Sequence, residues 1–557
     1  MGAIVRQADA EVMRLLGNDN PDWLNKLIAK RFKTDADVRY AKGENVCVEK
    51  LDMLNLNTAA ELIANHLNDG HMCYFFSDFD ADGMGCAAIA ERSMGMMGFV
   101  KNQDYIIQLP NRMKENHGLN RNAVLLAKQH DAHIIITMDN GSSCLKEIAL
   151  ARELGMDVVV TDHHEVPAPD IDAIMVNPKN PEDTFGDENF CGAGITYIIM
   201  NRIAEKLGKK LDNNILMQIA ATSTMADVVP LSVNNRSLVR QGVEAMRRNA
   251  IPFIRAVCDV QRVDVRGITP TDLGWKVAPL LNAVGRLGKP DDAYKALNCG
   301  DRYAKDIAQH LFNNNKKRQN MLAEMLQSNP DVHIQRDKVH LLCARDWHIG
   351  LVGLMAGRKN VETGTVVGCG CPGGDDEWRI SFRSPGNGAA IGDALVNAAK
   401  DGVIIGGGGH DGAGGCTVKG GNLEQLADYL NEHLGIVYNE TEIDGTVHPS
   451  WWTVDKIQAV EKALHPFGNG NPDITMYFKG VPDKVDIISD GKHLVMYFGE
   501  TKVMAFGDGG LVSDIPGSEV GFVYSPSINK WRGSETVQAI VDKIISITPK
   551  MDMNVIS

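Results

Sequence analysis

Between residues 71 and 164, three apolar runs each end in acidic or histidine side chains, and this repeated pattern constrains the fold most. The runs are HMCYFFSDFDADG (71–83), HIIITMDNGSS (133–143) and MDVVVTDHH (156–164). Short apolar runs bounded by turn residues are typical of buried strands. The polar side chains at their ends are Asp78, Asp80, Asp82, Asp139, Asp162, His163 and His164.

Helical patterns follow the first two runs. They are GMGCAAIAERSMGMMG (83–98) and SSCLKEIALARELG (142–155), where we expect Ser142 or Ser143 to cap the second helix and Gly155 to end it. Strands that alternate with helices predict right-handed crossovers and a parallel sheet. The polar clusters should then lie together at the carboxyl edge of that sheet.

A fourth acid, Asp227, ends a helix-compatible segment, LMQIAATSTMADVVPL (216–231). Carboxylates with only a few imidazoles suit Mn²⁺ or Mg²⁺ rather than Zn²⁺. Ligands from four segments are enough for two ions about 3.5–4 Å apart, which is the separation that clamps both oxygens of an in-line phosphoryl displacement. The pattern therefore indicates metal-assisted phosphoester hydrolysis. For any single acid, a helix cap or a solvated turn remains the alternative.

The rest of the chain indicates an α/β protein of several domains. We expect an N-terminal segment (1–45), a parallel-sheet domain (46–240), a helical connection (241–335), a second α/β domain (336–440) and a small β-barrel or sandwich (441–557). The helical connection includes a long helix over residues 302–327. The second α/β domain contains the glycine-dense IIGGGGHDGAGGCTV (404–418), which we expect to form a loop.

Composition excludes several classes of protein. A net charge of -14 and a pI near 5.6 argue against coating of nucleic acid by the whole surface, although bound cations can make one site locally positive. Eleven cysteines without a CxxC pair fit a reduced, cytoplasmic protein. No apolar segment has the length of a membrane span or the form of a signal peptide.

The motifs DFDADG, MDNG, TDHH and MADVVPL resemble, in order and spacing, the four motifs of the DHH phosphoesterase superfamily. Over roughly residues 40–550, the chain resembles the RecJ family of single-strand-specific exonucleases within it. The further matching segments are PNRMKENHGLN (110–120), CGAGITYII (191–199), APLLNAVGRL (278–287), DWHIGLVGLMAGR (346–358), SFRS (381–384), GGGHDGAGG (407–415), HPFGNGNP (465–472) and INKWRGSETVQAIVDKI (528–544).

This resemblance implies roles for the site residues. The ligands of two Mn²⁺ or Mg²⁺ ions would be Asp80, Asp82, Asp139, His163 and Asp227. His164 would lie beside the scissile phosphate, either as a ligand or as a contact of the transition state and leaving group. Asp78 and Asp162 would support the ligands as catalytic-site residues.

Substrate contacts are implied in the second α/β domain and in the C-terminal domain. Gly408, Gly409 and His410 would let the backbone approach a phosphodiester, with a simple tight turn as the alternative. The resemblance implies a 5′-phosphate pocket made by Ser381 and Arg383, joined by Arg112. The C-terminal domain resembles an OB fold, and its candidate contacts to single-stranded DNA are Tyr477, Phe478, Lys530, Trp531 and Arg532. Trp347 is expected in the core, and Trp531 either in the core or as a stacking platform.

Two positions depart from the family pattern. Gly412 replaces an alanine of the glycine segment, and Leu280 stands where the family commonly has arginine or another polar residue. No metal-ligand position is substituted.

The implied activity is single-stranded-DNA-specific 5′ to 3′ exonuclease action that releases 5′-mononucleotides, in DNA repair, recombination or phage DNA metabolism. The implied partners are single-stranded DNA, a single-strand-binding protein and a helicase, for a monomer that does not bind membranes. One alternative is a phosphodiesterase of short oligonucleotides or cyclic dinucleotides. Another is a non-catalytic, Cdc45-like replication scaffold, and a family II pyrophosphatase is a weaker option because those chains are shorter.

Overall fold

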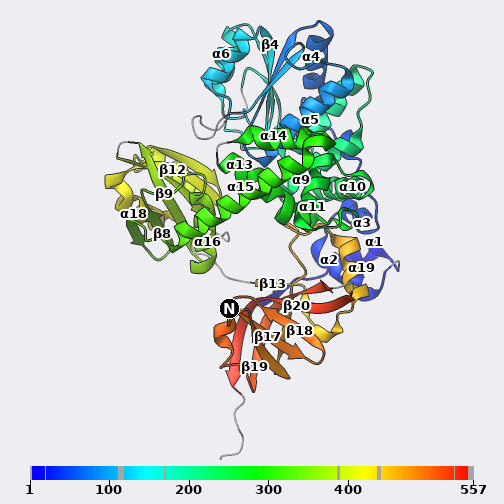
Figure 1. Cartoon of the computed structure of the whole chain (residues 1–557), viewed down its shortest axis with the longest axis vertical. Coiled ribbons are helices and arrows are strands. Elements are labelled where there is room, and N and C mark those ends of the chain that lie inside the picture. The colour runs from blue at the N-terminus through cyan, green and yellow to red at the C-terminus, as the bar shows by residue number, and fades with distance from the viewer. Residues whose placement is uncertain are drawn as a thin grey trace, which may run out of the picture. The chain divides into compact units, whose positions relative to one another are not determined.

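The computed structural model describes residues 3–18, 20–110, 118–167, 171–287, 289–374, 376–385, 389–435, 441–531 and 534–549 (Figure 1). The chain divides into two compact units. The first unit contains residues 1–281, 290–308 and 440–557, and the second contains residues 282–289 and 309–439. The five-part division expected from the sequence stays a prediction.

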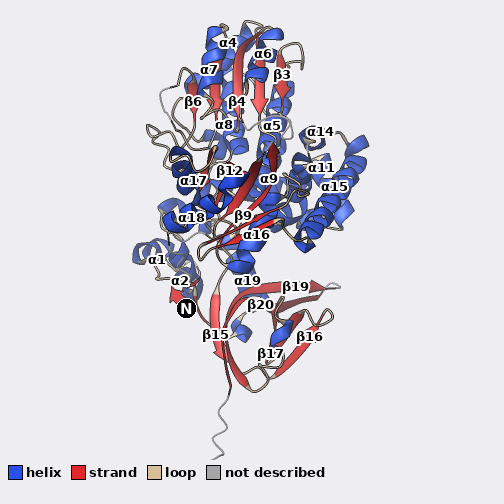
Figure 2. Ribbon diagram, turned by 90° about the vertical axis from the view of Figure 1, so that its left-hand side faces the viewer, coloured by secondary structure: helices blue, strands red, loops and turns tan. Residues whose placement is uncertain are grey.

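A five-stranded sheet forms the frame of the first unit. Its strands, in spatial order, are β3 (Tyr105–Gln108), β2 (Met72–Ser77), β4 (Ala132–Met138), β5 (Asp157–Thr161) and β6 (Ile174–Val176). All four pairings are parallel, so the predicted parallel sheet is confirmed. Helices α4 (Leu56–Asn68), α5 (Ala81–Met97) and α8 (Gly192–Lys206) cover one face, and α6 (Arg121–Gln129) and α7 (Leu145–Glu153) cover the other; α4, α5 and α6 are labelled in Figure 1, and α7 and α8 in Figure 2.

The helix that follows β4 begins later than the sequence suggested. Cys144 precedes α7 without a side-chain cap, so the prediction of a cap by Ser142 or Ser143 is wrong. The backbone N–H of Ser142 instead donates to Asp162 Oδ2 at 3.0 Å. The turn before α7 is therefore shaped by the polar cluster beside it rather than by helix capping. Gly155 follows the end of the helix in the left-handed region, at φ 80°, as predicted.

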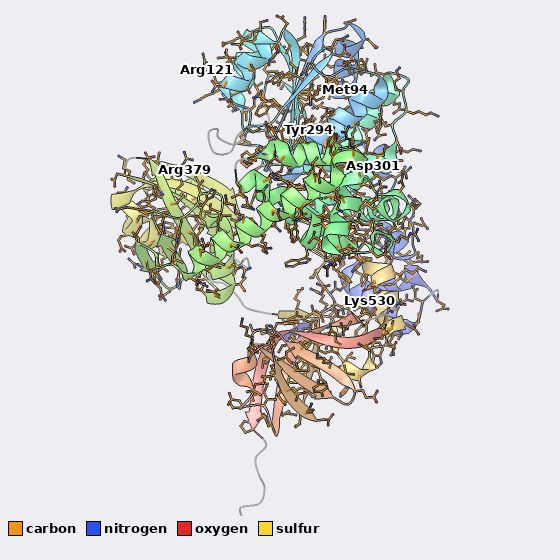
Figure 3. All side chains as sticks on the ribbon, viewed as in Figure 1. Met94, Arg121, Tyr294, Asp301, Arg379 and Lys530 are labelled. Atoms are coloured by element: carbon orange, nitrogen blue, oxygen red, sulfur yellow. The ribbon has the colours of Figure 1, made fainter. Side chains whose placement is uncertain are left out.

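A helical layer follows the parallel sheet. It comprises α9 (Asn213–Asp227), α10 (Val233–Asn249), α11 (Pro252–Gln261), α12 (Pro270–Asp272), α13 (Ala278–Arg286), α14 (Pro290–Asn298) and α15 (Asp301–Gln327). The long helix expected over residues 302–327 is confirmed as α15. Helix α14 packs against α5. Lys101, which follows α5, donates a hydrogen bond from Nζ to the hydroxyl of Tyr294 on α14 at 2.7 Å (Tyr294 is labelled in Figure 3).

The N-terminal elements pack with the C-terminal sheet. They are β1 (Ala3–Val5), α1 (Ala10–Leu16), α2 (Asp22–Arg31) and α3 (Asp35–Ala41). Leu24 and Ile28 of α2 share one apolar core with Trp452 and Phe522. Arg31 also forms a bidentate ion pair with the buried Asp444, with Nη2–Oδ2 and Nε–Oδ1 distances of 2.6 and 3.0 Å.

The C-terminal segment forms a seven-stranded sheet, shown in Figure 2. Its strands, in spatial order, are β14 (Gly445–Thr446), β15 (Met476–Gly480), β19 (Ser518–Trp531), β20 (Ser534–Pro549), β18 (Thr501–Ala505), β17 (His493–Phe498) and β16 (Lys484–Ile488). A further strand, β13 (Thr441–Ile443), pairs with β1, and helix α19 (Val454–Leu464) packs against β19 and β20. The predicted change to a β domain is confirmed.

The second unit is built on a six-stranded mixed sheet. Its strands, in order, are β11 (Gly406–His410), β12 (Ala413–Lys419), β10 (Glu377–Arg383), β9 (Val366–Gly374), β8 (Val339–Cys343) and β7 (Val332–Gln335). Besides the α13 and α15 residues that it includes, its helices are α16 (Val352–Thr363), α17 (Ile391–Lys400) and α18 (Leu423–His433). In the described parts of the chain, none of the helices combines the length and apolar character that a bilayer crossing requires.

The glycine-dense segment is a β-hairpin, so the expectation of a loop is wrong. Strands β11 and β12 pair from Gly406 to His410, and only Asp411 and Gly412 lie between them. Helix α17 packs closely on this hairpin: a Cβ on Gly414 of β12 would lie 2.7 Å from Leu395 Cδ1 of α17, and a Cβ on Gly392 of α17 would lie 2.4 Å from the carbonyl oxygen of Gly409. Close packing thus accounts for the glycines at positions 407, 409 and 414, where a Cβ would lie within 3 Å of other atoms.

Candidate metal centre

The polar residues predicted at the strand ends do converge in the first unit. Asp78 and Asp80 follow β2, Asp139 follows β4, His163 follows β5, and Asp227 is the last residue of α9. Three overlapping groups have potential ligand atoms within 4.8 Å of one another. They are Asp139–His163–His164, Asp82–His163–Asp227 and Asp78–Asp80–Asp139.

His163 lies at the centre of this cluster. Its Nε2 is 3.1 Å from Asp139 Oδ1, 3.8 Å from Asp227 Oδ2 and 3.9 Å from Asp82 Oδ2. Burial, together with repulsion from His164, lowers the pKa of His163 to about 3. The imidazole is therefore neutral at physiological pH, which is the form that binds a metal.

Asp139 has an uncompensated buried carboxylate. Its side chain is 2% exposed, and neither oxygen accepts a hydrogen bond from the described residues. Burial and the negative charges of Asp82, Asp80 and Asp78 raise its pKa well above the ordinary value. Its backbone is in the left-handed region, at φ 62°, which marks a sharp turn directly after β4. A buried carboxylate without donors costs free energy unless a cation compensates it.

Asp82 is fixed by the first turn of α8. Gly192 N–H donates to Oδ2 at 2.6 Å and Ala193 N–H donates to Oδ1 at 3.0 Å. Burial and repulsion from Asp227 and Asp80 still raise its pKa well above the ordinary value. The start of α8 contributes to this site although the sequence analysis gave it no role; the run of small residues that opens the helix was a usable signal.

Asp227 and Asp80 complete the acidic cluster. Burial and repulsion from Asp80 raise the pKa of Asp227 to about 7. Asp80 Oδ1 caps α5 by accepting the N–H groups of Asp82 and Gly83, both at 3.0 Å. Asp78 Oδ1 accepts the N–H of Phe79 at 2.7 Å. Burial first, and then the mutual repulsion of these acids, raises the pKa values of Asp82, Asp139 and Asp227, so a bound cation would favour their ionised forms.

Asp162 organises the histidine turn. Its Oδ1 accepts the N–H of His163 at 2.8 Å and that of His164 at 3.2 Å, and it lies 2.8 Å from His164 Nδ1. Burial alone would lower the pKa of His164, but the hydrogen bond and charge of Asp162 raise it to about 9. Burial alone would raise the pKa of Asp162, yet the interactions with His164 hold it well below its usual range. Asp162 therefore favours the protonated form of His164, whose side chain is 48% exposed.

Asn177 steadies the same turn, and the sequence analysis missed it. Its Nδ2 donates to the carbonyl oxygen of His164 and to Ser142 Oγ, both at 2.9 Å. Asn177 follows β6 at the sheet edge, and its side chain is buried. The strand-end rule could have found it, because β6 is a short edge strand in the same parallel order.

The proposed substrate residues of the second unit lie in register across three strands. On β10, Arg383 pairs with Ala413 of β12, which in turn pairs with His410 of β11. Two residues away, Ser381 pairs with Gly415, which pairs with Gly408. Directly opposed residues of antiparallel strands project from the same face, so Arg383 and His410 lie on one face of the sheet, with Ala413 of β12 between them.

Other predicted contacts fall in different surroundings. Arg112, Arg532 and the side chain of Trp531 lie outside the described residues. Phe478 packs with Phe498 and Phe522 at ring-centroid distances of 5.3 and 5.9 Å, and Tyr477 is half-buried. Lys530 pairs with Glu535 at 2.8 Å on the exposed end of β19 (Figure 3).

Two further positions are part of the core. Trp347 is 4% exposed and donates to Ser328 Oγ at 2.9 Å, as expected for a core residue. Leu280 is 1% exposed, so this departure from the family pattern contributes to packing.

The donor set fits a divalent metal that prefers oxygen. Carboxylate oxygens dominate, a single neutral imidazole lies among them, and the described residues leave both Asp139 oxygens without hydrogen bonds. Such ligation suits Mn²⁺ or Mg²⁺. Several acids are crowded into one buried site, and a bound cation would compensate their negative charge.

Sequence comparisons match two domain families. Residues 72–224 match the DHH family, N-terminal domain, and residues 443–543 match the RecJ OB domain. The single-stranded-DNA-specific exonuclease RecJ of Escherichia coli is 29% identical over 97% of this chain and 98% of its own length. The RecJ of Bacillus subtilis is 28% identical over 88% of this chain, which spans 64% of that longer protein.

Solved structures show the same fold. RecJ of Thermus thermophilus in complex with Mn²⁺ matches 98% of this chain and 79% of its own, with a TM-score of 0.79 and 21% identity. Exonuclease RecJ bound to manganese matches 70% of this chain and 96% of its own, with a TM-score of 0.57 and 25% identity. The chain thus combines a DHH-family domain with a RecJ OB domain, and it is RecJ-like in sequence and fold over nearly its whole length.

Proposed function

We propose that this protein is a metal-dependent exonuclease that degrades single-stranded DNA from its 5′ end and releases 5′-mononucleotides. The observation that carries the proposal is the cluster of acids around the neutral His163, with its uncompensated Asp139 carboxylate. The names of the RecJ relatives, which specify single-stranded DNA, support the substrate. Their similarity extends through the OB domain, which favours this activity over the short-oligonucleotide and scaffold alternatives.

The residues proposed to hold two Mn²⁺ or Mg²⁺ ions are Asp80, Asp82, Asp139, His163 and Asp227. When bound, such ions supply Lewis-acid activation and a nucleophilic water. Asp162 keeps His164 protonated, so the imidazolium can donate a hydrogen bond to the phosphate or leaving oxygen. Asp78 and Asp162 act by holding the turns on which these residues stand.

The substrate-binding role is proposed for the aligned surface of the second unit. Arg383 offers a guanidinium that can bind a terminal phosphate, and Ser381 and His410 lie in the same or the neighbouring row. Gly408 and Gly409 allow close approach of a sugar-phosphate backbone. Arg112, Trp531 and Arg532 complete the proposed set of DNA contacts. The 336–440 region is thus a substrate-binding domain in this proposal.

The cellular setting is also part of the proposal. An exonuclease specific for single strands needs a supply of unwound DNA, so a helicase and a single-strand-binding protein are the proposed partners. We propose a monomer that acts in the cytoplasm, in DNA repair, recombination or phage DNA metabolism.

The test uses the purified full chain with Mn²⁺ and a single-stranded DNA oligonucleotide labelled at either end. The 5′ label should appear at once as a mononucleotide while the 3′-labelled strand shortens progressively. Duplex and RNA should resist, and Asp139→Ala should remove the activity. Cleavage of dinucleotides or cyclic dinucleotides alone would replace this proposal with the phosphodiesterase alternative. An inactive wild-type protein with every metal would favour the scaffold.

A further inference from the structure

The residue directly after Asp227 has an unusual backbone. Val228 ends α9 in the left-handed region, at φ 61°, and its side chain is 62% exposed. Glycine or asparagine usually occupies such a helix terminus, because a β-branched side chain is strained there. Apolar burial does not account for the conformation of such an exposed residue, so other contacts must hold it.

A hairpin from the C-terminal part of the first unit supplies those contacts. Asn469 Nδ2 donates to the carbonyl oxygen of Val228 at 2.9 Å, and the N–H of Leu231 donates to the carbonyl oxygen of Asn469 at 2.7 Å. Gly470 continues the contact, because a Cβ there would lie 3.1 Å from Pro230 Cβ and 3.3 Å from Leu231 N. One side of the segment after Asp227 therefore rests on residues more than two hundred positions later in the chain.

The hairpin itself is firmly built. Gly468 and Asn471 exchange backbone hydrogen bonds at 2.9 and 3.1 Å, and Gly470 provides the positive φ of 72° that the tight turn requires. The buried Asn471 side chain donates to the carbonyl oxygens of Leu464 and Pro466, both at 2.8 Å, which ties the hairpin to the end of α19. Its tip, Asn469, is thus presented from a fixed base.

The opposite side of the segment is held by α10. Asn235 Nδ2 donates to the carbonyl oxygen of Pro230 at 2.8 Å, and the side chain of Ser232 caps the helix by accepting the N–H of Asn235 at 3.3 Å. The Asp227 turn is consequently clamped between α10 and the hairpin. The hydrogen bond to Val228, the residue next to the Asp227 carboxylate, comes from the hairpin.

We propose that Asn469 is a positioning residue for Asp227, holding Val228 in its left-handed conformation so that the Asp227 carboxylate faces His163 and Asp82. This inference rests on the proposed role of Asp227 as a metal ligand. It goes beyond that role, because it makes the C-terminal part of the chain a component of the metal centre rather than only a surface for DNA.

The test measures Mn²⁺ binding directly, from the loss of the electron paramagnetic resonance signal of free Mn²⁺ on titration with full-length protein. Asn469→Ala should raise the Mn²⁺ dissociation constant roughly two- to tenfold, the value of one hydrogen bond. The matched control is Asn529→Ala, an exposed asparagine of β19, which should bind Mn²⁺ as the wild type does. Thermal melting without metal establishes that both variants are folded.

A second variant separates positioning from general loss of structure. Glycine adopts the left-handed conformation without strain, so Val228→Gly should make the Asn469 contact dispensable. In the Val228→Gly background, Asn469→Ala should therefore cause less than about half of its effect in the wild type, as a coupled pair requires.

Three outcomes would overturn the inference. Wild-type Mn²⁺ affinity in Asn469→Ala would remove the positioning role, provided that Asp227→Asn binds Mn²⁺ weakly. An equal effect of Asn469→Ala in both backgrounds would show that the contact does not act through Val228. If Asp227→Asn binds Mn²⁺ like the wild type, the ligand role of Asp227 fails, and the inference fails with it.

Discussion

Asp139 and His163 leave the ends of two neighbouring parallel strands and meet with Oδ1 and Nε2 3.1 Å apart. The carboxylate has a raised pKa and the imidazole a lowered one, because burial disfavours the charged form of each. The pair is therefore poorly satisfied by itself and well suited to share a cation. This conflict between metal-free stability and metal binding leads to the first prediction.

Asp139→Asn should stabilise the metal-free protein and abolish metal binding. The amide removes a buried carboxylate that the described residues leave without donors, so the metal-free melting temperature should rise by several degrees. Activity should fall by more than the ~100-fold that loss of an outer-shell partner costs. Calorimetric melting with and without Mn²⁺ checks both effects, and a metal-induced rise in melting temperature as large as that of the wild type would contradict them.

The metal-free protein should lose stability through Asp227 as the pH rises. The pKa of this carboxyl is raised from 3.8 to about 7 on folding, so the folded state binds more protons than the unfolded state between these values. Stability from this group is thus present at low pH and is lost as the pH rises from about 4 to about 7. The difference in unfolding free energy between wild type and Asp227→Asn should follow this course in denaturant titrations. A pH-independent difference would show that the pKa is not raised.

Asp162→Asn should move the alkaline limit of activity downward. Without the carboxylate, His164 loses the partner that raises its pKa to about 9, so it deprotonates at a lower pH. Activity at neutral pH should fall about 10- to 100-fold, as is usual for an outer-shell partner. The measurement is the pH profile of kcat for both proteins. An unchanged alkaline limb in the variant would rule out a protonated His164 as the acting form.

Gly192→Ala should weaken Mn²⁺ binding, because the added Cβ would lie 2.6 Å from Asp139 Cβ. The strain of such overpacking costs about 1–3 kcal/mol, and relief requires Asp139 to move. Gly267→Ala is the matched control, since a Cβ there meets nothing within 4 Å. Metal titration and thermal melting of both variants are the checks. Equal behaviour of the two variants would show that the α8 start does not shape the centre.

Arg383→Ala should raise the KM for oligonucleotides with a 5′ phosphate about 10- to 100-fold, the value of lost charge-assisted hydrogen bonds. Oligonucleotides with a 5′ hydroxyl should be affected much less. Arg379→Ala, from the same strand β10 (Figure 3), is the control and should leave both KM values unchanged. A loss that is the same for both kinds of 5′ end would remove the terminal phosphate from the role of Arg383.

The strand-end acids were predictable because their signal is local. An apolar run followed by a polar cluster fixes both the strand and its carboxyl end, and parallel order then brings Asp80, Asp139 and His163 together. The start of α7 was not predictable in this way. The turn before it is held by the hydrogen bond from the Ser142 N–H to Asp162, which lies beyond the helix in the sequence. Similarly, the glycine segment reads as a loop until the close approach of α17 is known.

Contacts between distant segments left no readable signal. The residues around Val228 in the sequence carry no pattern that predicts its hydrogen bond with Asn469, which donates to the Val228 carbonyl oxygen. The segment HPFGNGNP matches a family motif, but this match does not indicate that the hairpin contacts the segment after Asp227. Such partners are set by tertiary packing, which single-sequence patterns do not report.

The pairing of the first helices with the last sheet affects how the protein is made. Arg31 leaves the ribosome long before Asp444, its partner 413 residues later. At a synthesis rate of about 5–20 residues per second, the apolar side of α2 stays uncovered for roughly 20–80 s, until the strands that pack against it have been made. During that interval the nascent chain exposes Leu24 and Ile28, which later lie in the shared core. The first unit can therefore complete its folding only after the strands of residues 441–549 have been synthesised, and nascent chains of this protein should depend on chaperones that shield their N-terminal helices.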